Sequence, residues 1–151
     1  LIATTLVSML QQQTQFIRWW KTQDFIAEDA PLTNAMVARL FSNADAFRLH
    51  DTQANAILNT GGVVAGGTAM TLGFTQPDGT RVKGLLWFQN NELWYGVFNA
   101  AGTAVPVANS WRVAREVDTA NSSFSVVGGV MQLTLTGPYG GSATYAATPS
   151  L

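Results

Sequence analysis

The chain has 151 residues, which is enough for one ordinary domain or two small ones. It contains no cysteine and one histidine, so disulfides, thiol catalysis, cysteine-ligated metals and metal sites built from several histidines are excluded. Charged residues make up 11% of the chain and balance to −1, so it lacks the basic stripe with which a nucleic-acid binder holds phosphates.

Glycine divides the chain into two parts. All 14 glycines follow residue 60, and Pro31 is the only proline before that point. Because glycine punctuates turns, its absence over the first part favours helix, whereas the second part is typical of short strands with tight turns. The sequence therefore predicts an α+β protein: N-terminal helices for oligomerisation or attachment over 1–60, then a C-terminal antiparallel β domain over 61–151.

The first predicted helix starts at the beginning of the chain. Apolar residues recur at alternating spacings of four and three, with one glutamine among them: Ile2, Leu6, Met9, Gln13, Phe16 and Trp20. The first charged residue is Arg18, but the glutamines over 11–15 would be costly in lipid, so we expect no membrane span.

A connection over 24–30 is expected to precede a second helix, with Asp29 as its cap, Pro31 in its first turn and a seam that continues to Leu58. The same alternation continues there in Val37, Leu40, Ala44, Phe47, Asp51, Ala54 and Leu58. Sustained spacing of this kind favours a coiled coil between copies, and we expect a homo-oligomer, with a trimer preferred. The predicted interface is formed by Leu6, Met9, Gln13, Phe16, Trp20, Val37, Leu40, Ala44, Phe47, Asp51 and Leu58. The alternative is an amphipathic helix that covers its own domain, for which the spacing is nearly the same.

Turn residues predict two hairpins in the second part. Asn tolerates positive φ, so Asn90-Asn91 can form a two-residue loop, and Gly128-Gly129 can form another. These loops fix the register of the strands beside them. The expected pairs include Trp87 with Trp94 and Val127 with Val130.

Weaker signals lie around the hairpins. Residues 61–67 are rich in glycine and are interpreted as a flexible link between the helices and the sheet. Residues 70–74 alternate as a half-buried strand, and 111–117 as another. Residues 137–151 are expected to form a loose tail or a final edge strand.

The register of the first hairpin leaves both of its faces apolar. One face carries Val82, Leu86, Phe88, Leu93, Tyr95 and Val97, and the other carries Lys83, Leu85, Trp87, Trp94 and Phe98. A small antiparallel sheet normally keeps one face in water, so the second face must be covered. Lys83, Trp87, Trp94 and Phe98 are therefore candidates for a core, a subunit interface or a platform on which sugar rings stack.

No pattern in the sequence indicates catalysis. His50 is expected to be a solvated helical residue, and Asp24 and Glu28 are expected to lie on a solvated face rather than hold a cation. Glu116 and Asp118 are expected to share a strand face, but nothing marks them as a catalytic pair. We therefore expect no enzymatic activity, no cofactor and no metal.

The order of these segments resembles bacteriophage virion fibres and related trimeric appendage proteins. The stretch from Gly84 to Tyr95, followed by Ser110-Trp111, is similar to the strand, Asn turn, strand and late tryptophan of phage tail-fibre modules, and 57–61 has the same character. The resemblance implies a non-enzymatic structural or host-attachment role in an extracellular virion, with other virion proteins as partners.

Two other functions remain open at this point. A carbohydrate-binding or receptor-binding module would use the face of Trp87 and Trp94 to hold a glycan. A filament or pilus subunit anchored by residues 1–20 would form open polymers rather than closed oligomers.

Overall fold

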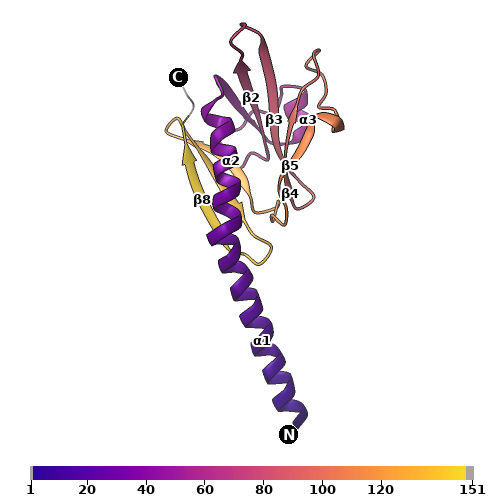
Figure 1. The fold of residues 1–151 in the computed structure, drawn as a ribbon, viewed down its shortest axis with the longest axis vertical. Helices are drawn as coiled ribbons and strands as arrows, with labels where there is room; N and C mark the ends of the chain where they lie inside the picture. The colour runs from indigo at the N-terminus through magenta and orange to yellow at the C-terminus, as the bar shows by residue number, and fades with distance from the viewer. Residues whose placement is uncertain (1, 149–151) are drawn as a thin grey trace.

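The computed structural model describes residues 2–148. The chain opens with one continuous helix, formed by α1 (Ile2–Asp24), a wide turn η1 (Phe25–Asp29) and α2 (Ala30–Ser42). Figure 1 shows α1 projecting away from the body of the molecule, while α2 lies against the strands. The predicted α+β architecture, a helical N-terminus followed by antiparallel sheets, is confirmed.

The predicted connection over 24–30 is wrong, because the helix runs through it. In η1 the Ala30 N–H donates to the carbonyl of Phe25, five residues back, and Asp29 has helical backbone angles (φ −72°, ψ −46°) without a side-chain cap. Proline has no N–H with which to continue a regular helix, and a wider turn directly before Pro31 lets the chain stay helical. Phe25 and Ala30 are both buried, so packing holds this turn in place.

The predicted second helix, with its seam continuing to Leu58, is wrong beyond Ser42. β1 (Ala46–His50) follows, and then the short helix α3 (Gln53–Ile57). The Asp45 N–H donates to the carbonyl of Gly73 at 2.8 Å, which places the chain beside the next strand. Spacings of four and three are compatible with a helix, but pairing with the sheet overrides them.

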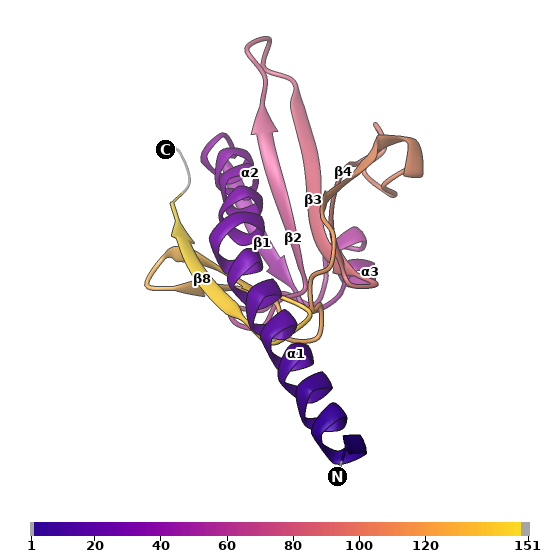
Figure 2. The same ribbon diagram turned by 60° about the horizontal axis from the view of Figure 1, so that its bottom comes forward.

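Two antiparallel sheets form the body (Figure 2). The larger has the order β1-β2-β3-β4-β5, with β2 (Ala69–Thr75), β3 (Arg81–Gln89), β4 (Glu92–Val97) and β5 (Ser110–Ala114). The smaller has the order β6-β7-β8, with β6 (Ser123–Val127), β7 (Val130–Thr136) and β8 (Ser142–Ala147). A short 3-10 turn, η2 (Val107–Asn109), leads into β5.

Both predicted hairpins are confirmed together with their register. Asn90 and Asn91 adopt positive φ angles of 50° and 61°, and the two glycines of the second loop do the same. Two successive left-handed residues make a tight turn whose twist matches that of the strands. The observed pairs are Trp87 with Trp94 and Val127 with Val130.

The other predicted strands are confirmed in part. β2 covers 70–74, and β8 is the final edge strand of the smaller sheet. The strand predicted over 111–117 ends at Ala114, and Glu116 beyond it has a φ of 55°, so Glu116 and Asp118 do not share a strand face.

Residues 61–67, predicted to link the helices to the sheet, run from α3 to β2 and form backbone hydrogen bonds with both sheets. The Val63 N–H donates to the carbonyl of Leu49 at 3.1 Å. Gly67 and Phe124 exchange two backbone hydrogen bonds of 2.8 and 2.9 Å, which connects this segment to β6. Backbone groups on both sides of the segment are thus paired.

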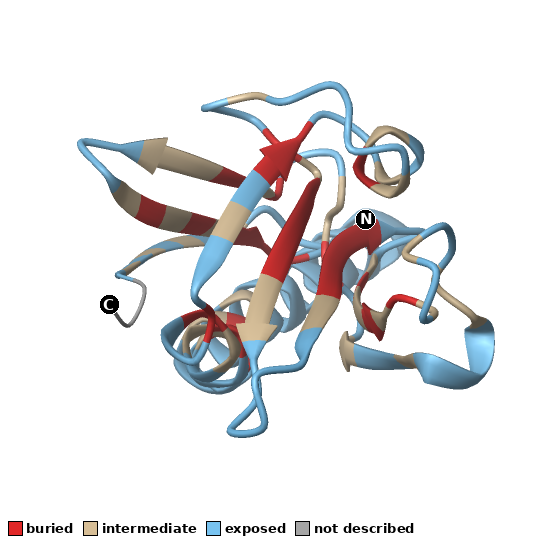
Figure 3. Ribbon diagram, turned by 90° about the horizontal axis from the view of Figure 1, so that it is seen from above, coloured by how far each residue is buried: buried red, intermediate tan, exposed pale blue. Residues whose placement is uncertain are grey.

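The main core lies between α2, one face of the larger sheet and the smaller sheet. Phe88 of β3 and Phe124 of β6 bring their ring centroids within 5.0 Å, so aromatic packing joins the two sheets. Figure 3 shows the buried segments concentrated in the strands at the centre of the body.

Candidate assembly and ligand-binding surfaces

α1 is a helix without a packing partner for its apolar side chains. None of its residues is buried. Nine large apolar side chains on it are each more than half exposed: Ile2, Leu6, Val7, Met9, Leu10, Phe16, Ile17, Trp19 and Trp20. A contiguous exposed apolar surface of this kind marks an interaction site in most proteins, so α1 is the candidate assembly surface.

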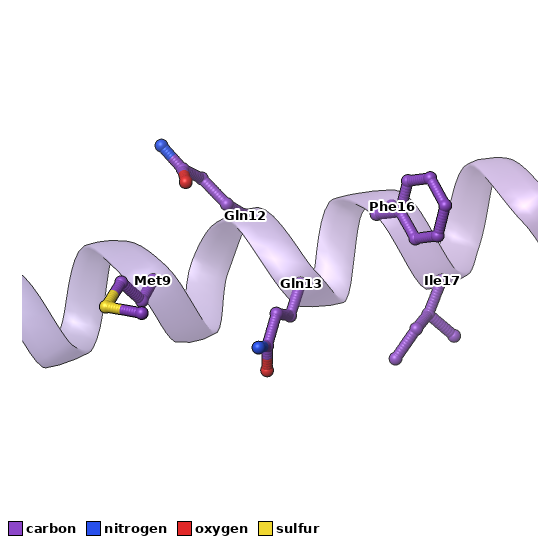
Figure 4. A pocket seen from close by; sticks show the side chains of 5 residues that line it. All are labelled: Met9, Gln12, Gln13, Phe16 and Ile17. Carbon is purple, nitrogen blue, oxygen red and sulfur yellow. The ribbon is translucent and has the colours of Figure 1, made fainter.

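Most of these side chains lie on one face of α1. At about 100° per residue, all except Val7 and Trp19 fall within an arc of roughly 120°, with Gln13 at its centre. A hollow of about 350 Å³ on this face is lined by Met9, Gln12, Gln13, Phe16 and Ile17. Figure 4 shows that all five side chains leave the same helix, so no second element closes the hollow.

The rest of the circumference of α1 is polar but uncharged. From Ile2 to Ile17 the helix carries no acidic or basic side chain. The Thr14 hydroxyl donates to the carbonyl of Leu10 at 2.9 Å, so this polar group is satisfied within the helix. Covering α1 on several sides would therefore bury no charge before Arg18.

The structure separates the predicted interface residues into two groups. The first group lies exposed on α1: Leu6, Met9, Gln13, Phe16 and Trp20. In the second group, Val37 and Ala44 are fully buried in the core of the chain itself, and Leu40 and Phe47 pack against that core. Asp51 and Leu58 are exposed on either side of α3. The helical seam predicted over 37–58 does not exist, and α2 covers its own domain instead.

The helix is fixed to the β domain near η1. The buried ring of Phe25 lies on the backbone of Gly137, where an added Cβ would come within 2.7 Å of the Phe25 Cγ. Lys21 Nζ donates to the Tyr139 hydroxyl at 3.3 Å and lies 5.3 Å from the centroid of its ring. The turn between β7 and β8 therefore holds the base from which α1 projects.

The aromatic face of the β3–β4 hairpin is a small second core. Trp87 and Phe98 are only 5% and 6% exposed, and they pack with Ala56 of α3. Trp94 stacks on Trp87 with 6.2 Å between ring centroids, and Lys83 Nζ lies 4.6 Å from the centroid of Phe98. Three interpretations were open for this face: a core, a subunit interface or a sugar platform. The side chains of Trp87 and Phe98 belong to a core, because too little of either is exposed to contact a sugar or a second subunit.

His50 is a buried strand residue, so its prediction as a solvated helical residue is wrong. Its Nδ1 lies 2.7 Å from the carbonyl oxygen of Thr60, and its Nε2 lies 3.2 Å from the hydroxyl of Thr71. Because a carbonyl only accepts, Nδ1 donates to Thr60 in this contact, while the Thr71 hydroxyl also donates to the Arg48 carbonyl at 3.3 Å. Both ring nitrogens therefore lie in polar contacts, which join β1 to Thr60 and to β2.

Acidic residues gather where α1 meets the turn between β7 and β8. Asp24, Asp29 and Glu116 line a hollow of about 160 Å³ together with Lys21. Across residues 2–148, no group of three or more His, Cys, Asp or Glu side chains is placed to hold a metal ion.

A groove between α2 and β5 did not follow from the sequence. It has a volume of about 430 Å³. Its helix wall is formed by Met36, Arg39, Leu40 and Asn43, and its sheet wall by Tyr95, Trp111, Arg112 and Val113. Burial raises the pKa of Tyr95 above its ordinary value. Alternation identifies Trp111 as a strand residue, but only the fold brings α2 beside it.

The chain matches no protein-family model, no curated protein and no solved structure. Within the part of the chain that the structure describes, no helix is long and apolar enough to cross a membrane.

Proposed function

We propose that this chain is a non-enzymatic structural subunit of an extracellular appendage, which assembles with copies of itself through α1 and displays its β domain. The observation that carries the proposal is α1 itself, a helix with no buried residue and nine large apolar side chains that are more than half exposed. Fully burying one such side chain contributes about 1.5–3 kcal/mol, so several of them on each copy can offset the entropy lost on association.

The first form of this proposal is a fibre or decoration protein of a bacteriophage virion. Three copies of α1 would pack their apolar arcs around a common axis. Gln13 at the centre of the arc would then fix the register, as single polar core residues do in coiled coils. The β domains would lie at the end of the helical bundle, accessible to a host receptor or to other virion proteins.

The second form is a filament or pilus subunit, and the uncharged circumference of α1 favours it. In a closed trimer the outer side of each helix faces water, where charged side chains are usual. In an open polymer, neighbouring copies surround the helix and would also cover Val7 and Trp19, which lie outside the main arc. Heterologous contacts that do not close produce such polymers.

Light scattering and electron microscopy of the whole chain test the proposal. The wild type is expected to exceed the monomer mass of 16.2 kDa, threefold in the fibre form or as extended polymers in the filament form. Leu6→Glu places a charge within the apolar arc and should give monomers in both forms. A wild type that stays monomeric at every concentration, or a Leu6→Glu variant that assembles equally well, would contradict the proposal.

Gln11→Glu distinguishes the two forms. Gln11 lies roughly 160° from the centre of the apolar arc, so the same charge is placed on the opposite side of the same helix. A closed trimer leaves that side in water and should tolerate the change. In a filament, neighbouring copies would bury that side of α1, so Gln11→Glu should prevent filament formation. Glutamate is a good helix former, so neither variant should melt α1.

A further inference from the structure

The groove between α2 and β5 offers polar groups that the chain does not use. Arg39 and Asn43 are four residues apart at the end of α2, so both lie on the side of the helix that faces the groove. Neither side chain has a hydrogen-bond or ion-pair partner within 2–148. Both groups can therefore bind a ligand without breaking an existing contact.

The opposite wall of the groove presents an aromatic surface. Trp111 is 54% exposed although its ring stacks on Tyr95, with 5.9 Å between centroids and 18° between planes. Tyr95 thus supports one side of the indole and leaves the remainder to solvent. An indole held in this way is a flat stacking surface that needs little ordering on binding.

The groove carries positive charge in a chain whose net charge is −1. Two guanidinium groups line it, those of Arg39 and Arg112, and no carboxylate does. Arg112 is bound to Glu92 at 2.8 Å, so its charge is already compensated. The charge available to a ligand is that of Arg39, and a carboxylate is a group that a guanidinium binds well.

We propose that this groove binds a saccharide that carries a carboxylate, such as a sialic acid or uronic acid unit. The apolar face of the sugar ring stacks on Trp111, the carboxylate pairs with Arg39, and Asn43 binds a ring hydroxyl. A volume of about 430 Å³ falls within the range of small-ligand sites. The sheet wall consists of the five-residue edge strand β5 and Tyr95 of β4 and exposes one indole, which suits one sugar ring better than an extended acidic peptide. The site is independent of assembly through α1.

Titration calorimetry of the whole chain tests the proposal with three probes. Sialyllactose and trigalacturonate are the acidic probes, and lactose is the neutral counterpart of sialyllactose. At least one acidic probe is expected to bind at least tenfold more tightly than lactose, and added salt should weaken it. Absence of binding by both acidic probes, or a lactose affinity equal to that of the tighter acidic probe, would overturn the proposal.

Two pairs of variants separate the site from the rest of the surface. Trp111→Ala should weaken the acidic probe at least tenfold, and Arg39→Gln should remove the preference for the acidic over the neutral sugar. Tyr139→Ala and Arg115→Gln are the matched controls, because both residues are exposed and lie outside the groove. Circular dichroism checks that all four variants are folded.

The variants also define the results that count against a saccharide. Unchanged affinity in Trp111→Ala, or an equal loss in the controls, contradicts the assignment. A tetraglutamate peptide that binds where the sugars do not, and is lost in Arg39→Gln, would assign the groove to an acidic protein partner instead.

Discussion

Tyr95 connects the interior of the larger sheet with the exposed groove. Its hydroxyl lies over the backbone of Gly84 on β3, where an added Cβ would come within 2.8 Å of the hydroxyl oxygen. Its ring supports Trp111 on the edge strand. The absence of a side chain at position 84 therefore makes room for the tyrosine that holds the exposed indole.

Ionisation of Tyr95 should make the stability of the fold depend on pH. Burial raises the pKa of Tyr95, so the folded chain holds the phenolic proton more tightly than the unfolded chain does. Tyrosines in an unfolded chain have a pKa of about 10. The resulting stability is fully present below about pH 10 and is lost as pH rises from there through the raised folded pKa. In urea titrations at several pH values, the free energy of unfolding should fall above about pH 10, and Tyr95→Phe should reduce that fall.

Burial also raises the pKa of Tyr145, so the free energy of unfolding of Tyr95→Phe should still fall to some extent at high pH. In the double variant Tyr95→Phe, Tyr145→Phe, the free energy of unfolding should depend even less on pH above about pH 10. Equal slopes for the wild type and Tyr95→Phe would show that Tyr95 is not protected from ionisation by the fold.

For single residues, the sequence predicts on which face of a hairpin a side chain lies, but it does not predict which other element covers that face. The register predicted for the first hairpin places Trp87 and Phe98 together correctly, but their burial depends on α3, which comes from an earlier part of the chain. Trp111 is exposed because β5 is the edge strand of the larger sheet. Both facts are tertiary, and no local pattern contains them.

Among the secondary-structure elements, the two hairpins were predicted best from the sequence, because short turn motifs define them. The Asn90-Asn91 and Gly128-Gly129 loops adopt left-handed conformations that few other residues tolerate, so turn and register follow from a few residues. β1 was missed because the spacing of Phe47 and its neighbours is compatible with helix until the partner strand is known. The continuous helix was missed because Pro31 and the acidic residues before it are typical of the start of a new helix. In the structure, the wide turn η1 keeps the chain helical through this region.

The contact between Phe25 and Gly137 should be sensitive to a single added methyl group. Gly137→Ala places a Cβ within 2.7 Å of the buried phenyl ring, so the ring or the turn must move. Overpacking of this kind costs about 1–3 kcal/mol, which urea unfolding followed by tryptophan fluorescence can measure at one protein concentration.

Gly73→Ala is the matched control for this substitution. The nearest atoms to its added Cβ would be 3.8 Å away, and the new methyl group also restricts the unfolded chain. Its free energy of unfolding should equal or exceed that of the wild type. If Gly137→Ala were as stable as Gly73→Ala, Phe25 would not anchor the helix to the β domain.

The whole molecule consists of a body that completes its own core and a helix that does not. The 23 residues of α1 extend about 35 Å and contribute no buried residue, while the body fills the space between α2 and two sheets. Such a chain leaves a large apolar surface in water as a monomer. The proposed association of copies through α1 would remove that surface and would leave the groove beside α2 exposed on the body.

Protection of one introduced thiol on α1 tests this assembly most directly. The chain has no cysteine of its own, so Met9→Cys places a single reporter within the apolar arc, and Gln76→Cys places one on the exposed turn between β2 and β3. In concentrated protein we predict that a maleimide reacts with position 9 at least tenfold more slowly than with position 76, and that dilution removes the difference. Equal rates at both positions in concentrated protein would contradict assembly through α1.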